Sequence, residues 1–156
     1  MVLAAAVVSV ALAAAGCGGS GTQSAADYRA QAEEICAGMN QTIESWRAPQ
    51  TPAEYGRYLD KLVAVIEPAL RQLADLDPPK ELRPEHERAL RLAERGVGLL
   101  RRIVRGIHRG EDARQLALVY GTQADAAIGR ANAILRGLDL PECAKDPQPR
   151  KPAPPA

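Results

Sequence analysis

Apolar residues recur every three or four positions along most of the chain, the spacing that gathers them on one face of an α-helix. Strand-forming residues never alternate with polar ones over a useful length, so the pattern predicts an all-α protein. The first helical segment begins near Ser24 and ends at Ala48-Pro49. Its apolar stripe contains Tyr28, Ala32, Ile35, Cys36, Met39, Ile43 and Trp46.

The second segment has the clearest start signal in the chain. Thr51 can cap a helix, Pro52 suits its first position, and Glu54 is placed to complete a capping box. Pro68 lies inside the segment on the polar face, where we expect it to bend the helix rather than end it. The segment stops before Asp77-Pro-Pro79, and its stripe is Tyr55, Leu59, Leu62, Ile66, Leu70 and Leu73.

Two more helices follow, one from about Pro84 to Gly110 and one from Asp112 to Leu138. Each is about 25 residues long, or ~37 Å. Short connections between long helices place neighbours antiparallel, so the sequence predicts an up-down-up-down four-helix bundle. The inward residues are Leu90, Ala93, Val97, Leu100, Val104 and Ile107 in the former, and Leu116, Tyr120, Ala124, Ala127, Ile128, Ala131 and Leu135 in the latter.

The start of the chain has the pattern of a bacterial lipoprotein signal. Residues 1–16 are uncharged and largely apolar, and small residues lead to Cys17, whose thiol would carry the lipid. Residues 17–23 then form a flexible, glycine-rich tether. Ala14 stands where Leu is commonest, and no basic residue precedes the apolar run. Ordinary secretion, with Cys17 a free thiol, and a lasting membrane anchor helix are the alternatives.

The chain has three cysteines, and with Cys17 assigned to the lipid, Cys36 and Cys143 remain as a pair. In an exported domain we expect these two to form a disulfide. In the chain-entropy description such a bridge stabilises the fold by ~4–5 kcal/mol. Two separate thiols are the alternative. The predicted helical domain covers residues 24–143. Residues 144–156 contain five prolines and are predicted to form a disordered tail. The cysteine pair also argues against a metal centre, because no nearby histidine completes a ligand set.

The sequence offers little catalytic chemistry. His86 falls on the inward face of its helix and is expected to cap or pack, while His108 lies at the edge of the stripe. No Glu-x-x-His, Cys-x-x-Cys-His or Gly-x-Ser-x-Gly pattern occurs. We therefore predict no enzyme, no metal and no cofactor. An enzyme would require polar groups that converge around His86.

A basic stripe runs along the outer side of the third helix. With 20 basic and 19 acidic residues, the chain has a formal net charge of +1, which does not favour a nucleic-acid binder. Anionic lipid head groups or cell-wall polymers are candidate partners for the stripe. A solvated face balanced by Glu85, Glu87 and Glu94 is the alternative. The stripe consists of Arg88, Arg91, Arg95, Arg102, Arg105 and Arg109.

Several short patterns together resemble the small helical lipoproteins of high-GC Gram-positive (actinobacterial) bacteria. They are Ala15-Gly-Cys17, Tyr28…Ala32-Glu-Glu-Ile-Cys36, Pro78-Pro79…Leu82-Arg-Pro84…His86 and Leu140-Pro-Glu-Cys143. The resemblance implies a lipid-anchored protein on the extracytoplasmic face of the cell membrane and no catalytic residue.

The combined interpretation is a non-enzymatic binding or scaffolding module of the cell envelope. Its expected partners are the membrane, through the lipid anchor, and an envelope protein or anionic polymer. The alternative is a carrier that holds a small apolar or lipid ligand between its helices. A filled core would favour the scaffold, and a large apolar cavity would favour the carrier.

Overall fold

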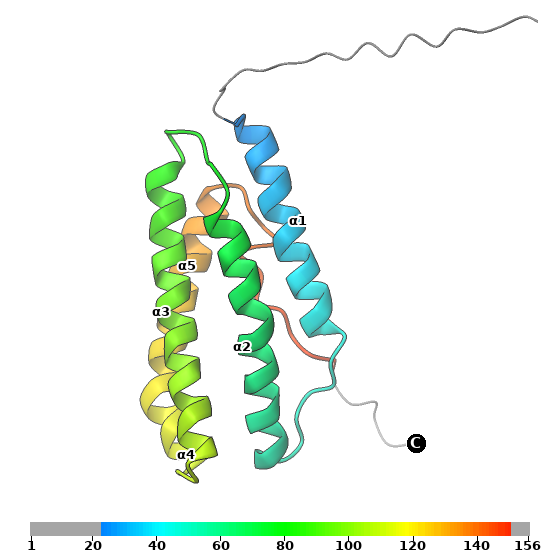
Figure 1. Ribbon diagram of the computed structural model, residues 1–156, viewed down its shortest axis with the longest axis vertical. Helices are drawn as coiled ribbons and strands as arrows, with labels where there is room; N and C mark the ends of the chain where they lie inside the picture. Colours follow the sequence, from blue (N-terminus) through cyan, green and yellow to red (C-terminus); the bar gives the residue numbers. More distant parts are fainter. Residues whose placement is uncertain (1–22, 151–156) are drawn as a thin grey trace, which may run out of the picture.

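A computed structural model describes residues 23–150, which form a helical bundle without β-strands in that range (Figure 1). The predicted all-α class is therefore confirmed. The predicted signal peptide (1–16), Cys17 and most of the tether lie outside the described residues. The elements are α1 (Ala25–Glu44), α2 (Pro52–Ala74), α3 (Arg83–His108), α4 (Ala113–Leu116), η1 (Ala117–Gly121) and α5 (Thr122–Gly137).

The starts of the first two helices follow from their capping residues. The Ser24 hydroxyl accepts a hydrogen bond from the Asp27 amide at 3.1 Å. At α2, the Thr51 hydroxyl accepts from the Glu54 amide, and the Glu54 carboxylate accepts from the Thr51 amide, both at 3.2 Å. The predicted capping box is thus confirmed. Backbone hydrogen bonds, first from Gln50 and then from Thr51, lower the pKa of Glu54.

The last helical rod differs from the prediction of one unbroken α-helix. It begins as expected, with the Asp112 carboxylate accepting from the Gln115 amide at 2.8 Å. After α4, however, η1 forms a turn of π-helix before α5 continues. A π-turn widens the backbone spiral and so shifts the side chains that follow from their α-helical positions. Within η1, Leu118 is 68% exposed and Val119 is 47% exposed.

The structure places residues 144–150, the first part of the predicted tail, against the rest of the bundle. Figure 1 shows this part of the chain running from the end of α5 to the link between α1 and α2. There the Arg150 amide donates to the Trp46 carbonyl at 2.8 Å, and the Ala48 amide donates to the Arg150 carbonyl at 3.1 Å. Prolines lack only their own amide hydrogen, so the residues between them still bond to a neighbouring chain. Residues 142–150 are called the C-terminal segment below.

The buried side chains form two separate clusters. The upper cluster, named for the end of the bundle where α2 ends and α3 begins, lies around the disulfide. It contains Tyr28, Ala32, Cys36, Leu73, Ala89, Leu135, Leu138, Leu140, Cys143 and Ala144. The lower cluster lies around the C-terminal half of α3 and contains Leu59, Leu99, Leu100, Ile103, Leu116 and Ala124. The core is therefore divided along the length of the bundle.

Two glycines of α3 occupy contrasting environments. A Cβ atom at Gly96 would lie 2.6 Å from Cγ1 of Ile128 and 3.4 Å from the Ala124 carbonyl, so α5 approaches α3 closely at this point. A Cβ atom at Gly98 would meet nothing within 4 Å. Adding a methyl group should therefore lower the stability of the fold at position 96 and raise it at position 98.

We expect Gly96→Ala to lower the free energy of unfolding by about 1–2 kcal/mol, because overpacking outweighs the gain in helix propensity. Gly98→Ala, the matched control, should raise it by up to about 1 kcal/mol. Urea unfolding followed by circular dichroism measures both. Equal effects of the same sign would contradict the close approach of α5 to Gly96.

Candidate functional site

An apolar cavity of about 200 Å³ lies between the two clusters. Side chains from α1, α2, α3 and α5 face it, and the C-terminal segment closes one side. Its apolar lining is Cys36, Met39, Ile43, Tyr58, Leu62, Ile66, Ala69, Leu70, Leu73, Ala93, Val97, Leu100, Ile128, Leu135, Cys143 and Pro147. Asn132, Lys145, Asp146 and Gln148 are the polar residues of the lining.

The cavity exists because the apolar stripe of α2 has too little to pack against. Leu62, Ile66 and Leu70 belong to the inward stripe, yet they are only half-buried. Opposite them, α3 contributes the short side chain of Ala93 to the cavity wall. An alanine fills much less space than the Leu or Ile side chains that usually fill a helical core, so a gap remains.

The disulfide predicted from the sequence is confirmed, and it forms part of the cavity wall. Cys36 and Cys143 are bonded, with their Cα atoms 4.9 Å apart. The bond attaches the C-terminal segment to the middle of α1 and holds it against the bundle. The structure therefore brings together the two cysteines that are 107 residues apart in the chain.

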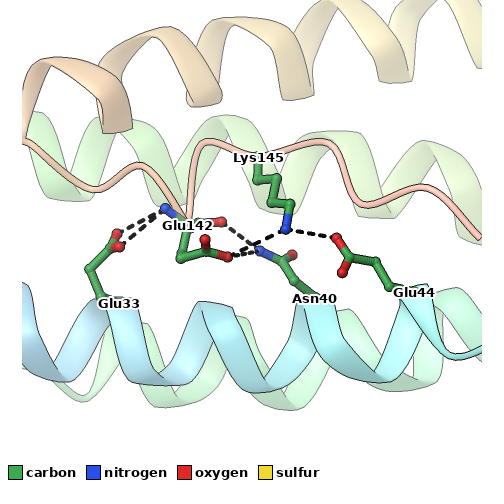
Figure 2. Close-up of polar contacts among 5 residues, drawn as sticks. All are labelled: Glu33, Asn40, Glu44, Glu142 and Lys145. Atoms are coloured by element: carbon green, nitrogen blue, oxygen red, sulfur yellow. Dashed lines mark hydrogen bonds and ion pairs between the residues drawn. The ribbon is translucent and has the colours of Figure 1, made fainter.

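Hydrogen bonds to Glu142 extend this attachment along α1 (Figure 2). Both carboxylate oxygens of Glu33 accept from the Glu142 amide, at 3.1 and 3.2 Å. The Asn40 side-chain amide donates to the Glu142 carbonyl at 2.7 Å and to its carboxylate at 3.1 Å. Asn40 is 1% exposed, so these bonds satisfy a donor that would otherwise be buried without a partner.

Lys145 makes the last of the contacts drawn in Figure 2. Its ammonium lies 2.8 Å from the Glu44 carboxylate and 3.8 Å from that of Glu142. The hydrogen bond to Glu44 is the main reason why the pKa of Lys145 is raised. Because all three side chains are roughly two-fifths exposed, these ion pairs hold the segment only weakly.

His86, the candidate centre of an enzyme, is buried as predicted, beside Tyr28. The Tyr28 hydroxyl lies 2.8 Å from His86 Nδ1, and the two rings meet edge to face. Burial lowers the pKa of His86 and raises the pKa of Tyr28 to about 12. Both side chains are therefore neutral at pH 7 and join α1 to α3 in the upper cluster. His108 instead bonds to Asp60 at 2.9 Å on the surface.

All six members of the basic stripe are exposed on α3: Arg88, Arg91, Arg95, Arg102, Arg105 and Arg109. None of them lines the cavity. The structure thus separates the predicted surface site from the internal one. Residues 145–148 form part of the cavity wall, whereas their sequence is that of a disordered tail. The signal that was available is Asn40, a polar residue on the inward side of α1 that requires a partner.

No family model, curated protein or solved structure matches this chain. Between residues 23 and 150, no helix combines the length and the hydropathy needed to cross a membrane. Within the same range, no three His, Cys, Asp or Glu side chains cluster in a way that could hold a metal ion.

We expect loss of the disulfide to destabilise the bundle strongly. Replacing both cysteines (Cys36→Ala with Cys143→Ala) should lower the free energy of unfolding by about 3–5 kcal/mol, because the bridge closes most of the domain. Urea unfolding with and without dithiothreitol measures this. The reductant should shift the wild-type midpoint and leave that of the double variant unchanged. A wild-type midpoint that does not move under reduction would contradict the expectation.

Proposed function

We propose that this protein is a helical binding module that carries a small apolar molecule in the cavity between its two core clusters. The observation that supports the proposal is the cavity itself, with its continuous apolar wall. Ligand sites in proteins are typically concave and apolar, with a few polar groups that fix orientation. A scaffold would require only a filled core, so the cavity favours the carrier over the scaffold.

The volume limits the size of the ligand. An engineered apolar cavity of about 150 Å³ stays dry and binds benzene. At about 200 Å³, this cavity suits an aromatic ring with a short alkyl chain, or a short alkyl chain alone. A complete membrane lipid, with two long chains, is much too large to be enclosed.

The four polar residues of the lining indicate that the ligand has one polar end. Asn132 lies on α5, while Lys145, Asp146 and Gln148 belong to the C-terminal segment. Hydroxyl or carbonyl groups of a ligand can form hydrogen bonds with these side chains. The favoured ligand class is therefore a small amphiphile whose apolar part lies between the clusters.

The proposal includes an antiparallel up-down-up-down arrangement, in which α4, η1 and α5 count as one rod. The connections at residues 45–51, 75–82 and 109–112 are short, which favours antiparallel neighbours. The colour order along the ribbons in Figure 1 is consistent with it. In this arrangement α1 lies on one side of the α2–α3 pair and the last rod lies on the other. The ligand would be held in the space that side chains of α1, α2, α3 and α5 enclose.

Alkylbenzenes from benzene to hexylbenzene provide a direct probe of the cavity. We expect saturable binding by the purified protein that is tightest for a short alkyl chain, since longer chains exceed the volume. Isothermal titration calorimetry measures the affinity, and 4-butylphenol tests whether a polar end strengthens it. Ala93→Met, which fills the cavity, should weaken binding at least tenfold.

The matched control for the filling variant is Ala133→Met, which adds the same side chain at an exposed position of α5. It should bind the alkylbenzenes as the wild type does. Equal loss in both variants, or no saturable binding by the wild type, would overturn the carrier function.

The module is further proposed to act at the outer face of a cell membrane, tethered by lipid on Cys17. The apolar run before Cys17 and the small residues beside it support this location. The disulfide supports it independently, because such bonds persist mainly in exported proteins. The glycine-rich residues that follow Cys17 would allow the bundle to move relative to its anchor.

In the producing cells, we expect mass spectrometry of the mature N-terminal peptide to show a lipid adduct on Cys17. Cys17→Ala should move the protein from the membrane fraction to the soluble fraction, while Ser20→Ala should leave it in the membrane. An unmodified Cys17 in membrane-bound protein would contradict the lipid anchor.

A further inference from the structure

Five arginines of α3, with Arg109 directly after it, form one exposed row along the molecule. Arg88, Arg95, Arg102 and Arg109 are seven residues apart, which is almost two turns of an α-helix, and Arg91 and Arg105 lie three residues after members of this series. All six side chains therefore share one face. Successive members of the seven-residue series are about 10.5 Å apart along the helix axis. The arginine row consists of Arg88, Arg91, Arg95, Arg102, Arg105 and Arg109, all of which are exposed.

Carboxylates balance only part of this charge. Arg91 pairs with Glu87 at 3.5 Å, and Arg109 pairs with Glu111 at 2.6 Å. Among the described residues, none of the other four arginines has a carboxylate within 4.0 Å. The exposed face of α3 therefore carries an excess of guanidinium groups that are free to bind anions.

An aromatic ring lies against the row, and two exposed apolar residues come directly before it in the chain. The Arg102 guanidinium lies over the Tyr120 ring, 6.0 Å from its centre. Leu118 and Val119 directly precede Tyr120, and they are the exposed large hydrophobic residues of the described chain. Neither residue belongs to the inward stripe of its helix, which contains Leu116 and Tyr120. A basic and an aromatic side chain in contact, with exposed aliphatic residues next to them in the chain, are typical of surfaces that bind at a membrane interface.

We propose that the arginine row, together with Leu118 and Val119, is a docking surface for an anionic lipid bilayer. The phosphates of the head groups would pair with the guanidinium groups, and the two aliphatic side chains would enter the boundary with the acyl chains. A soluble anionic polymer would neutralise the arginines but give Leu118 and Val119 no apolar surroundings. This docking surface is separate from the cavity, because none of the six arginines lines the cavity.

Vesicle binding tests this surface without the lipid anchor. Residues 18–156 contain every contact of the described fold, and circular dichroism checks that this protein is folded. We expect it to sediment with vesicles that contain phosphatidylglycerol and not with pure phosphatidylcholine. Each arginine near the surface contributes about fivefold to the partition coefficient, so the triple variant Arg88→Ser, Arg95→Ser, Arg105→Ser should bind on the order of 100-fold more weakly.

The matched control removes three exposed basic residues from α2 through Arg57→Ser, Lys61→Ser and Arg71→Ser. It changes the net charge equally and should keep most of the binding. Leu118→Ser with Val119→Ser should weaken binding even at high salt, where the electrostatic part is screened. Equal loss in the two triple variants would overturn the docking surface, and so would tight binding of soluble polyglutamate without binding to vesicles. None of the residues changed in the triple variant of the row or in the Leu118 and Val119 variant lines the cavity. The vesicle results and the alkylbenzene titration therefore test the docking surface and the carrier function separately.

Discussion

The fold depends on the covalent bond that joins the first helix to the returning end of the chain. Apart from its packing on α2, α1 is held mainly by residues 138–150. Arg29 donates to the Leu138 carbonyl, Asn40 donates to Glu142, and Cys36 is bonded to Cys143. Without the disulfide, these hydrogen bonds would have to overcome the chain entropy of a closed loop that contains most of the domain. The bond thus fixes one side of the cavity.

The opposite side is fixed by the close approach of α3 and α5. A side chain at Gly96 would meet Ile128, and one at Gly106 would lie 2.5 Å from Leu116. These contacts pack α3 tightly against α4 and α5. With α1 attached on one side and α5 on the other, α2 spans a distance that its half-buried Leu62 and Ile66 do not fill. The cavity results from these two constraints.

The sequence predicted the helices well and left open whether the core is filled or holds a cavity. Helix periodicity and capping residues are local signals, so Ser24, Thr51 and Asp112 marked the starts of their helices correctly. The disulfide followed from counting cysteines. The cavity depends on distances between helices that are set by contacts remote in sequence, such as Gly96 with Ile128. The order of residues 144–150 likewise depends on partners such as Trp46, and no local pattern in a proline-rich segment reveals them.

The contacts of the C-terminal segment differ greatly in strength along its length. Near Cys143 the segment is held by a covalent bond and by the buried Asn40. Beyond it, the exposed pair of Lys145 with Glu44 adds little, because solvent screens surface ion pairs. The two backbone hydrogen bonds of Arg150 complete the attachment. Residues 145–150 are therefore held against the bundle more weakly than the residues next to Cys143.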